Sequence, residues 1–161
     1  MTTIKPCLWF ASDAEAAASF YVSLFPRSRI VNVMRGGPGP EAPAIAVDFE
    51  LWGRPFMALN GRRTEGFNDS CSFAVPCESQ DEVDRYWDAL VAGGEEGQCG
   101  WLKDRFGVSW QVVPNALPGL LSDRDPARAG RAMQAMMGMR KLDIAAIERA
   151  RDGAEVGAAD R

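Results

Sequence analysis

Apolar residues recur at two different spacings along the chain, and the order of these spacings is repeated once. An apolar, aromatic run at Ile4–Phe10 predicts a strand. Apolar positions at helical spacing follow it and predict a helix that ends at Pro26. Three strand-like runs come next: Ser28–Met34, Ala44–Leu51 and Pro55–Asn60. The turn Trp52-Gly53-Arg54 joins the last two of them into a hairpin. This part of the chain predicts a β-α-β-β-β module.

The same order returns after about 64 to 67 residues. Ser70–Pro76 predicts a strand, a helix follows it up to Gly93-Gly94, and a hairpin closes the copy with Gly97–Lys103 and Gly107–Pro114. Each predicted helix begins with the spacing of a capping box, at Ser12 and Glu15 and again at Ser79 and Glu82. Cys7 falls on Cys71 when the two copies are aligned.

Two modules, at about 4–61 and 70–114, therefore occupy residues 1–115. We expect an α+β fold in which their sheets form a half-open barrel with the helices outside. Inward-facing strand residues would then line a cleft.

The C-terminal part has another composition. Residues 116–151 form the predicted helical extension. Asp125 followed by Pro126 is typical of a helix start, and Asp143 could cap a last short helix. A methionine-rich stripe between them predicts packing. Small and polar residues make up 152–161, which we expect to be a disordered tail.

Composition narrows the function. The 161 residues carry a net charge of −4 and no Lys/Arg cluster on a predicted element, which argues against a nucleic-acid partner. No signal peptide is evident, and no apolar run reaches the ~18 residues that span a bilayer, so we expect a cytoplasmic protein without a membrane partner. The four cysteines form no C-x-x-C pair, and we expect them to be buried rather than disulfide-bonded.

The chain has no histidine. This excludes a Ser-His-Asp triad, a Cys-His dyad, an H-E-x-x-H zinc site and a facial triad of two histidines and a carboxylate.

Several polar and aromatic residues lie on predicted strands. Gln111 stands between Trp110 and Val112, and its amide either faces the cleft or satisfies a backbone group at a sheet edge. Asn60, before Gly61, is either a cleft residue or a turn residue. One or two of the tryptophans, with Trp9 and Trp101 as candidates, would suit a flat or apolar ligand.

Two carboxylates alternate with apolar residues in AIAVDFELW. Asp48 and Glu50 share one face of the predicted strand. If that face lines a cleft, one of them could be a general base with a raised pKa. If it faces water, the two are ordinary solvated side chains.

Four segments carry a resemblance to a known family: KPCLWF, FYVSLFP, FMALNG and EEGQCGWLKDRFGVSWQVVPNAL. They resemble the PhnB-like family, also described as the "3-demethylubiquinone-9 3-methyltransferase" domain, of the vicinal oxygen chelate superfamily. The superfamily includes glyoxalase and the bleomycin-resistance proteins, and its fold is a pair of β-α-β-β-β modules. The resemblance covers residues 4 to 151 and implies a homodimer.

The resemblance also implies a site for a divalent metal, with histidine on a first strand and glutamate on a last strand. Cys7 and Cys71 stand where the histidines would be, and Gln111 stands where the glutamate would be. An uncharged amide is a weak ligand for a hard metal, so we expect no metal and no cofactor. A methyl-donor site is not expected either, because GGPGP and AGGEEGQCG precede predicted strands and neither contains G-x-G-x-x-G.

Three hypotheses remain. The first is a small-molecule binding protein with a metal-free cleft, lined by Gln111, Asn60, Trp9, Trp101 and Cys7. The second is an enzyme of lyase, isomerase or dioxygenase type that uses Glu50 or Asp48 as base, or a weakly held metal. In the third, the cleft is collapsed and the dimer is the functional unit.

Overall fold

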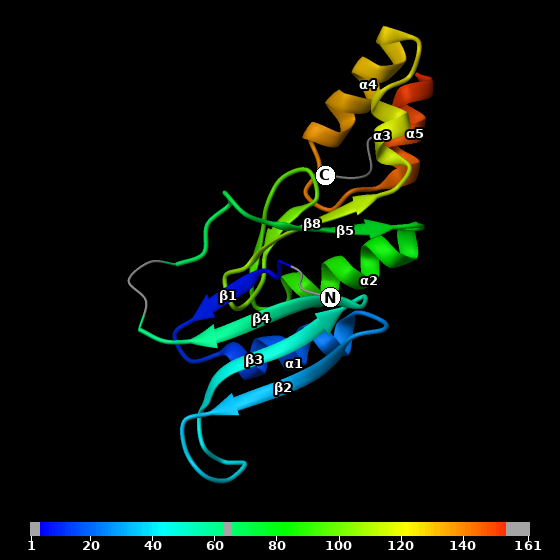
Figure 1. The fold of residues 1–161 in the computed structure, drawn as a ribbon. Coiled ribbons are helices and arrows are strands. Elements are labelled where there is room, and N and C mark those ends of the chain that lie inside the picture. Colours follow the sequence, from blue (N-terminus) through cyan, green and yellow to red (C-terminus); the bar gives the residue numbers. More distant parts are fainter. Residues whose placement is uncertain (1–3, 63–65, 154–161) are drawn as a thin grey trace. The chain divides into compact units, whose positions relative to one another are not determined.

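Each half of the chain forms one four-stranded mixed sheet with a helix packed on one of its faces (Figure 1). The structure is a computed structural model that describes residues 4–62 and 66–153. It divides into two units, unit 1 of Met1–Gly66 and unit 2 of Phe67–Arg161. The fold is of the α+β class, as the repeated pattern predicts.

Unit 1 has the predicted β-α-β-β-β order. Its elements are β1 (Cys7–Phe10), α1 (Ala14–Leu24), β2 (Arg29–Arg35), β3 (Ala44–Leu51) and β4 (Arg54–Asn60). The strands lie in the order β1-β4-β3-β2, with β1 parallel to β4 and the other pairs antiparallel. Between β3 and β4, Trp52 and Gly53 both have positive φ, 49° and 74°, which is typical of the type I′ turn of a tight hairpin.

The core of unit 1 lies between α1 and one face of its sheet. The helix buries a face of small residues and one tyrosine: Ala14, Ala17, Ala18 and Tyr21. The sheet buries Leu8, Phe10, Val47, Phe49, Leu51 and Ala58. These sheet residues alternate along their strands, so the residues between them lie on the face opposite α1, the α1-distal face.

Unit 2 repeats this topology. Its module consists of β5 (Phe73–Cys77), α2 (Gln80–Val91), β6 (Glu95–Glu96), β7 (Trp101–Lys103) and β8 (Ser109–Pro114), in the sheet order β5-β8-β7-β6. The helix buries Val83, Tyr86, Trp87 and Leu90, and the sheet buries Val75, Leu102, Trp110 and Val112. The face opposite α2 is the α2-distal face.

One predicted capping box is confirmed in part, because its serine caps the helix, and the other is wrong. The Ser79 hydroxyl accepts a hydrogen bond from the Glu82 amide at 3.3 Å, and the Glu82 carboxylate accepts one from the Glu78 amide at 2.9 Å. In contrast, α1 begins after Asp13 without a side-chain cap from that residue. Its first amide is satisfied from another strand.

The C-terminal extension contains the two predicted helices and one more. Asp125 accepts a hydrogen bond from the Ala127 amide at the start of α4 (Pro126–Met137), and Asp143 accepts one from the Ala146 amide at the start of α5 (Ile144–Asp152). The short α3 (Leu117–Leu121) was not predicted, since Pro118 and Gly119 interrupt its pattern. The three helices share a core of Leu117, Leu120, Ala132, Leu142 and Ile147.

Of the predicted tail, Asp152 still belongs to α5, and Gly153 ends that helix with a φ of 79°. Residues 154–161 lie outside the described residues. Among the helices that the structure describes, none is long and apolar enough to cross a membrane.

Candidate functional site

The strand register of unit 1 brings four predicted site residues onto one face. Cys7 lies opposite Met57, and Met57 lies opposite Asp48. Trp9 is two residues from Cys7, and Glu50 is two residues from Asp48, so all four share the α1-distal face. Trp9 is 46% exposed there. The alternation in the sequence predicted this face correctly.

Both carboxylates of this face are in ion pairs. Asp48 pairs with Lys5. Glu50 accepts two hydrogen bonds from Arg29, at 2.8 Å to Oε2 and 3.3 Å to Oε1. Hydrogen bonding to Arg29 lowers the pKa of Glu50. A general base for neutral pH needs a raised pKa, so the geometry argues against Glu50 in this role.

The thiol of Cys7 is also unsuited to ionic chemistry. Cys7 is exposed as a residue, but partial burial of its thiol raises the pKa of Cys7, and the nearby charge of Lys5 offsets this only in part. The thiolate is the form that binds metals and attacks electrophiles. Cys7 therefore contributes a neutral, polarizable surface beside Trp9.

Asn60 lies on the other face of the sheet. Its register partner Phe10 is buried, on the α1 side. The Asn60 Oδ1 accepts a hydrogen bond from the Ala14 amide at 2.9 Å, and Nδ2 donates to the Ala44 carbonyl at 2.9 Å. Asn60 is therefore not brought together with Trp9 and Cys7, because its amide joins the start of α1 to β3.

Gln111 lies on the α2-distal face of unit 2. Its register partners are Ala74 on β5 and Trp101 on β7. Gln111 Nε2 donates to the Ser72 hydroxyl at 2.8 Å. Within residues 66–153, the side-chain oxygen of Gln111, Oε1, has no hydrogen-bond partner. The hydrogen bond of the Gln111 amide goes to a side chain and not to a backbone group at a sheet edge, so the second of the two sequence interpretations is not observed. The oxygen Oε1 is left as an acceptor on the α2-distal face.

A hollow of about 540 Å³ lies beside Trp101 in unit 2. Its walls are Asp69, residues 95–99 and residues 101–103. Gln111 is not in these walls, but its cross-strand partner Trp101 is. The half-buried indole supplies an aromatic surface of the kind that binds flat or cationic groups.

The polar walls of the hollow carry three carboxylates and one ammonium group, those of Asp69, Glu95, Glu96 and Lys103. Asp69 accepts a hydrogen bond from the Ser109 hydroxyl at 2.7 Å, and its carboxylate lies 3.6 Å from Lys103 Nζ. Glu96 pairs with Arg140 at 3.1 Å. Sequence reasoning missed Asp69 and Glu95–Glu96, because Asp69 lies in a loop and β6 is too short to show an alternating pattern.

The metal site that the resemblance implies does not fit the residues present. In each sheet the corresponding row joins a first-strand residue to a last-strand residue on the helix-distal face. The rows are Cys7 with Met57 in unit 1 and Ala74 with Gln111 in unit 2. Cys71 precedes β5 and is not the counterpart of Cys7, so its predicted place on the first strand is wrong. Among the described residues, no three His, Cys, Asp or Glu side chains are grouped as a metal would require.

The links between strand and helix do not resemble a nucleotide site. Residues 11–13 join β1 to α1, and residues 78–79 join β5 to α2. Neither link contains glycine. A dinucleotide or methyl-donor site of the doubly wound type needs a glycine-rich turn at this point.

Comparison with known proteins identifies the family of the chain. The family model described as "3-demethylubiquinone-9 3-methyltransferase" matches residues 2–113. A PhnB protein from Bacillus cereus is 34% identical with a TM-score of 0.65, over 70% of this chain and 99% of that chain. Protein PA1353 from Pseudomonas aeruginosa, at 23% identity, has a TM-score of 0.61 over 71% of this chain and 98% of that chain.

The fold is also that of the fosfomycin resistance protein FosX from Listeria monocytogenes. This protein is 15% identical with a TM-score of 0.55, over 76% of this chain and 98% of that chain. No curated protein matches the chain. The family match ends at residue 113, so α3, α4 and α5 lie outside it.

Proposed function

The chain belongs to the PhnB-like 3-demethylubiquinone-9 3-methyltransferase family of the vicinal oxygen chelate superfamily, and on this premise we propose that it binds a small organic molecule without a metal ion. The binding site is the hollow beside Trp101. The observation that carries the proposal is this hollow, because it combines a partly exposed indole with charged walls on the sheet that also presents Gln111.

The lining indicates the class of molecule. The walls carry three carboxylates and one lysine, and Arg140 pairs with Glu96, so one net negative charge remains and the hollow favours a neutral or cationic ligand over an anionic one. A ring against Trp101 and an amino group near Glu95 or Glu96 would use both features. Benzylamine is the simplest probe with these two groups.

The proposal does not need catalysis. Arg29 lowers the pKa of Glu50, which removes the physical reason for choosing it as a base. Asp48 stays a candidate base without further support. A methyl transfer is not proposed, because no described link between strand and helix has the glycine-rich turn of a methyl-donor site. The homodimer and the cytoplasmic location stay predictions.

The proposal can be tested by nuclear magnetic resonance of the five tryptophan indole groups. Benzylamine should shift the Trp101 signal, which Trp101→Phe identifies. Trp101→Ala should weaken binding about ten-fold, as the loss of a cation–π contact of about 1–2 kcal/mol predicts. Trp9→Ala is the matched control in unit 1 and should leave the affinity unchanged. Equal affinity in wild type and Trp101→Ala would refute the site.

A second measurement tests the metal-free part. Chelation with EDTA and addition of Mn²⁺ should leave the benzylamine affinity unchanged. Native mass spectrometry of freshly purified protein would also report any carried molecule, any metal and the oligomeric state. A ligand that binds only with Mn²⁺ would overturn the metal-free proposal.

A further inference from the structure

The C-terminal extension, residues 116–153, holds the loop that walls the hollow. We propose that this extension is a positioning element: its docking fixes the loop of residues 97–100 and thereby sets the shape of the hollow. The link to ligand affinity rests on the proposed function, whereas the effect on the loop does not.

The contacts are made by the main chain. The Cys99 amide donates to the Met139 carbonyl and the Gly100 amide donates to the Arg140 carbonyl, both at 2.8 Å. The Cys99 thiol lies 3.7 Å from the Met136 carbonyl. Two successive loop amides thus bond two successive carbonyls of the segment that joins α4 to α5. Two bonds at successive residues fix both the position and the orientation of the loop backbone relative to the segment between α4 and α5.

The loop needs such support because its backbone conformation is unfavourable. Cys99 has a φ of 58°, in the left-handed region that residues other than glycine rarely adopt. Gly100 has a φ of 84°, and a Cβ at this position would lie 2.6 Å from the Val112 carbonyl oxygen and 3.1 Å from Leu142 Cδ1. The loop is therefore packed between its own sheet and the extension, and only glycine fits at residue 100.

The segment that holds the loop is itself anchored on α2. Gln80 uses both ends of its amide: Nε2 donates to the Leu142 carbonyl at 3.1 Å, and Oε1 accepts from the Ile144 amide at 2.9 Å. Lys141 pairs with Asp84 at 3.0 Å and with Asp88 at 3.3 Å. Since α2 belongs to the module that the family model matches, the extension contacts this module at two places, α2 and the loop of residues 97–100.

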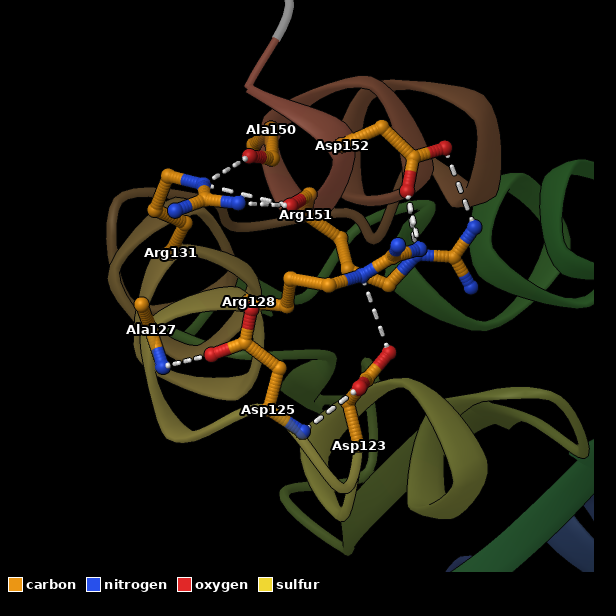
Figure 2. Close-up of polar contacts among 8 residues, drawn as sticks. All are labelled: Asp123, Asp125, Ala127, Arg128, Arg131, Ala150, Arg151 and Asp152. Atoms are coloured by element: carbon orange, nitrogen blue, oxygen red, sulfur yellow. Dashed lines mark hydrogen bonds and ion pairs between the residues drawn. The ribbon is translucent and has the colours of Figure 1, made fainter.

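Inside the extension, arginine side chains hold the helices together (Figure 2). Arg128 lies 3.2 Å from Asp123, before α4, and 2.5 Å from Asp152, at the end of α5. Arg131 donates from α4 to the Ala150 and Arg151 carbonyls, at distances from 2.6 to 3.1 Å. These contacts satisfy carbonyls at the C-terminus of α5. The extension can therefore act as one body on the loop.

Two residues of the hollow, Trp101 and Glu96, are directly linked to the docked extension. Trp101 follows Gly100 without an intervening residue, and Glu96 pairs with Arg140 of the extension at 3.1 Å. Val113, on the α2-distal face with Gln111, packs against the core of the extension. A loosened extension would move one wall of the hollow and leave the β7–β8 turn in place.

Amide hydrogen exchange measures the docking at the loop. In Gln80→Ala, which removes two hydrogen bonds of the anchor, the Cys99 and Gly100 amides should exchange about ten-fold faster. The Asp104 amide, which donates to Val108 at the other end of the hairpin, is the internal reference and should not change. Gln134→Ala is the matched control, because Gln134 is exposed on α4. Unchanged exchange at Cys99 and Gly100 in Gln80→Ala would overturn the proposal.

Benzylamine tests the coupling to the hollow. If benzylamine binds the docked loop better than the loosened one, saturating benzylamine should slow the exchange of the Cys99 and Gly100 amides in the wild-type protein, by at most the ratio of its dissociation constants for the loosened and the docked loop. Exchange of the Cys99 and Gly100 amides that stays unchanged at saturating benzylamine would refute the coupling. If benzylamine did not bind the wild-type protein, the proposed function would fail, while the exchange rates would still decide the role of the extension.

Discussion

Replacing Asn60 with alanine should destabilise unit 1 without affecting a ligand site. The Asn60 side chain is the only one that caps the first amide of α1 among the described residues, through its bond to Ala14 at 2.9 Å. It also donates to Ala44 on β3 at 2.9 Å. Asn60→Ala removes both bonds and leaves a helix amide and a strand carbonyl without their partner.

The size of the effect follows from the two bonds. Loss of a capping side chain costs about 1 kcal/mol, and loss of a second, half-buried hydrogen bond costs about 1 kcal/mol more. A change of about 2 kcal/mol in the free energy of unfolding corresponds to a fall in Tm of about 4–8 °C for a protein of this size. Asn60→Asp keeps the acceptor at the helix start but loses the donor, so its loss should be smaller.

Urea denaturation followed by circular dichroism would measure both variants. Asn32→Ala is the matched control, because Asn32 lies exposed on β2, on the α1-distal face beside Asp48. It should change the free energy of unfolding by less than about 0.5 kcal/mol. The reasoning would be refuted if Asn60→Ala were as stable as wild type, or if it lost benzylamine binding while keeping its stability.

Three further predictions concern buried and paired groups. Asp104 is 2% exposed and accepts hydrogen bonds from two backbone amides and from Trp110 Nε1, so Asp104→Ala should cost about 3 kcal/mol or more in urea denaturation, whereas the exposed Asp81→Ala should cost little. Hydrogen bonding to Arg35 lowers the pKa of Glu15 from its ordinary value of 4.5, so the ion pair stabilises the fold above that pH and this stability is lost as the pH falls through the lowered pKa. The free energy of unfolding should therefore fall less steeply with acid in Glu15→Gln than in wild type, and identical curves would contradict this. Burial raises the pKa of Cys77 to about 12, so iodoacetamide should label the exposed Cys71 in the folded protein and leave Cys77 unmodified until urea is added.

The module and its repeat could be predicted from sequence because each depends on local spacing. Apolar alternation gave β3 and β4, and Trp52-Gly53 gave the turn between them. Asp125 and Asp143 begin α4 and α5 as their positions predict. In each case the deciding partners are within a few residues along the chain. The half-open barrel stays a prediction.

Tertiary partners decided the features that sequence reasoning got wrong. Ser12 and Glu15 have the spacing of a capping box, but Arg35 holds Glu15 at 2.6 Å and Asn60 caps the helix from 46 residues away. The cysteines were expected to be buried, yet Cys7 and Cys71 are exposed. Cys7 is on the face that α1 does not cover, and Cys71 precedes its strand. No periodicity in a single sequence reports which loop closes over which face.

The two modules share a topology but do not share a site. At equivalent places in their sheets, unit 1 presents the row of Cys7 and Met57, and unit 2 presents the row of Ala74 and Gln111. The first row has two sulfur atoms and no strong hydrogen-bonding group, whereas the second has an amide beside Trp101 and the hollow. The C-terminal extension is also tied to the second module, through Cys99, Gly100 and Gln80. A polar strand face and its structural support thus coincide in unit 2, where we propose that the ligand binds, and Trp9 of unit 1 is therefore the matched control.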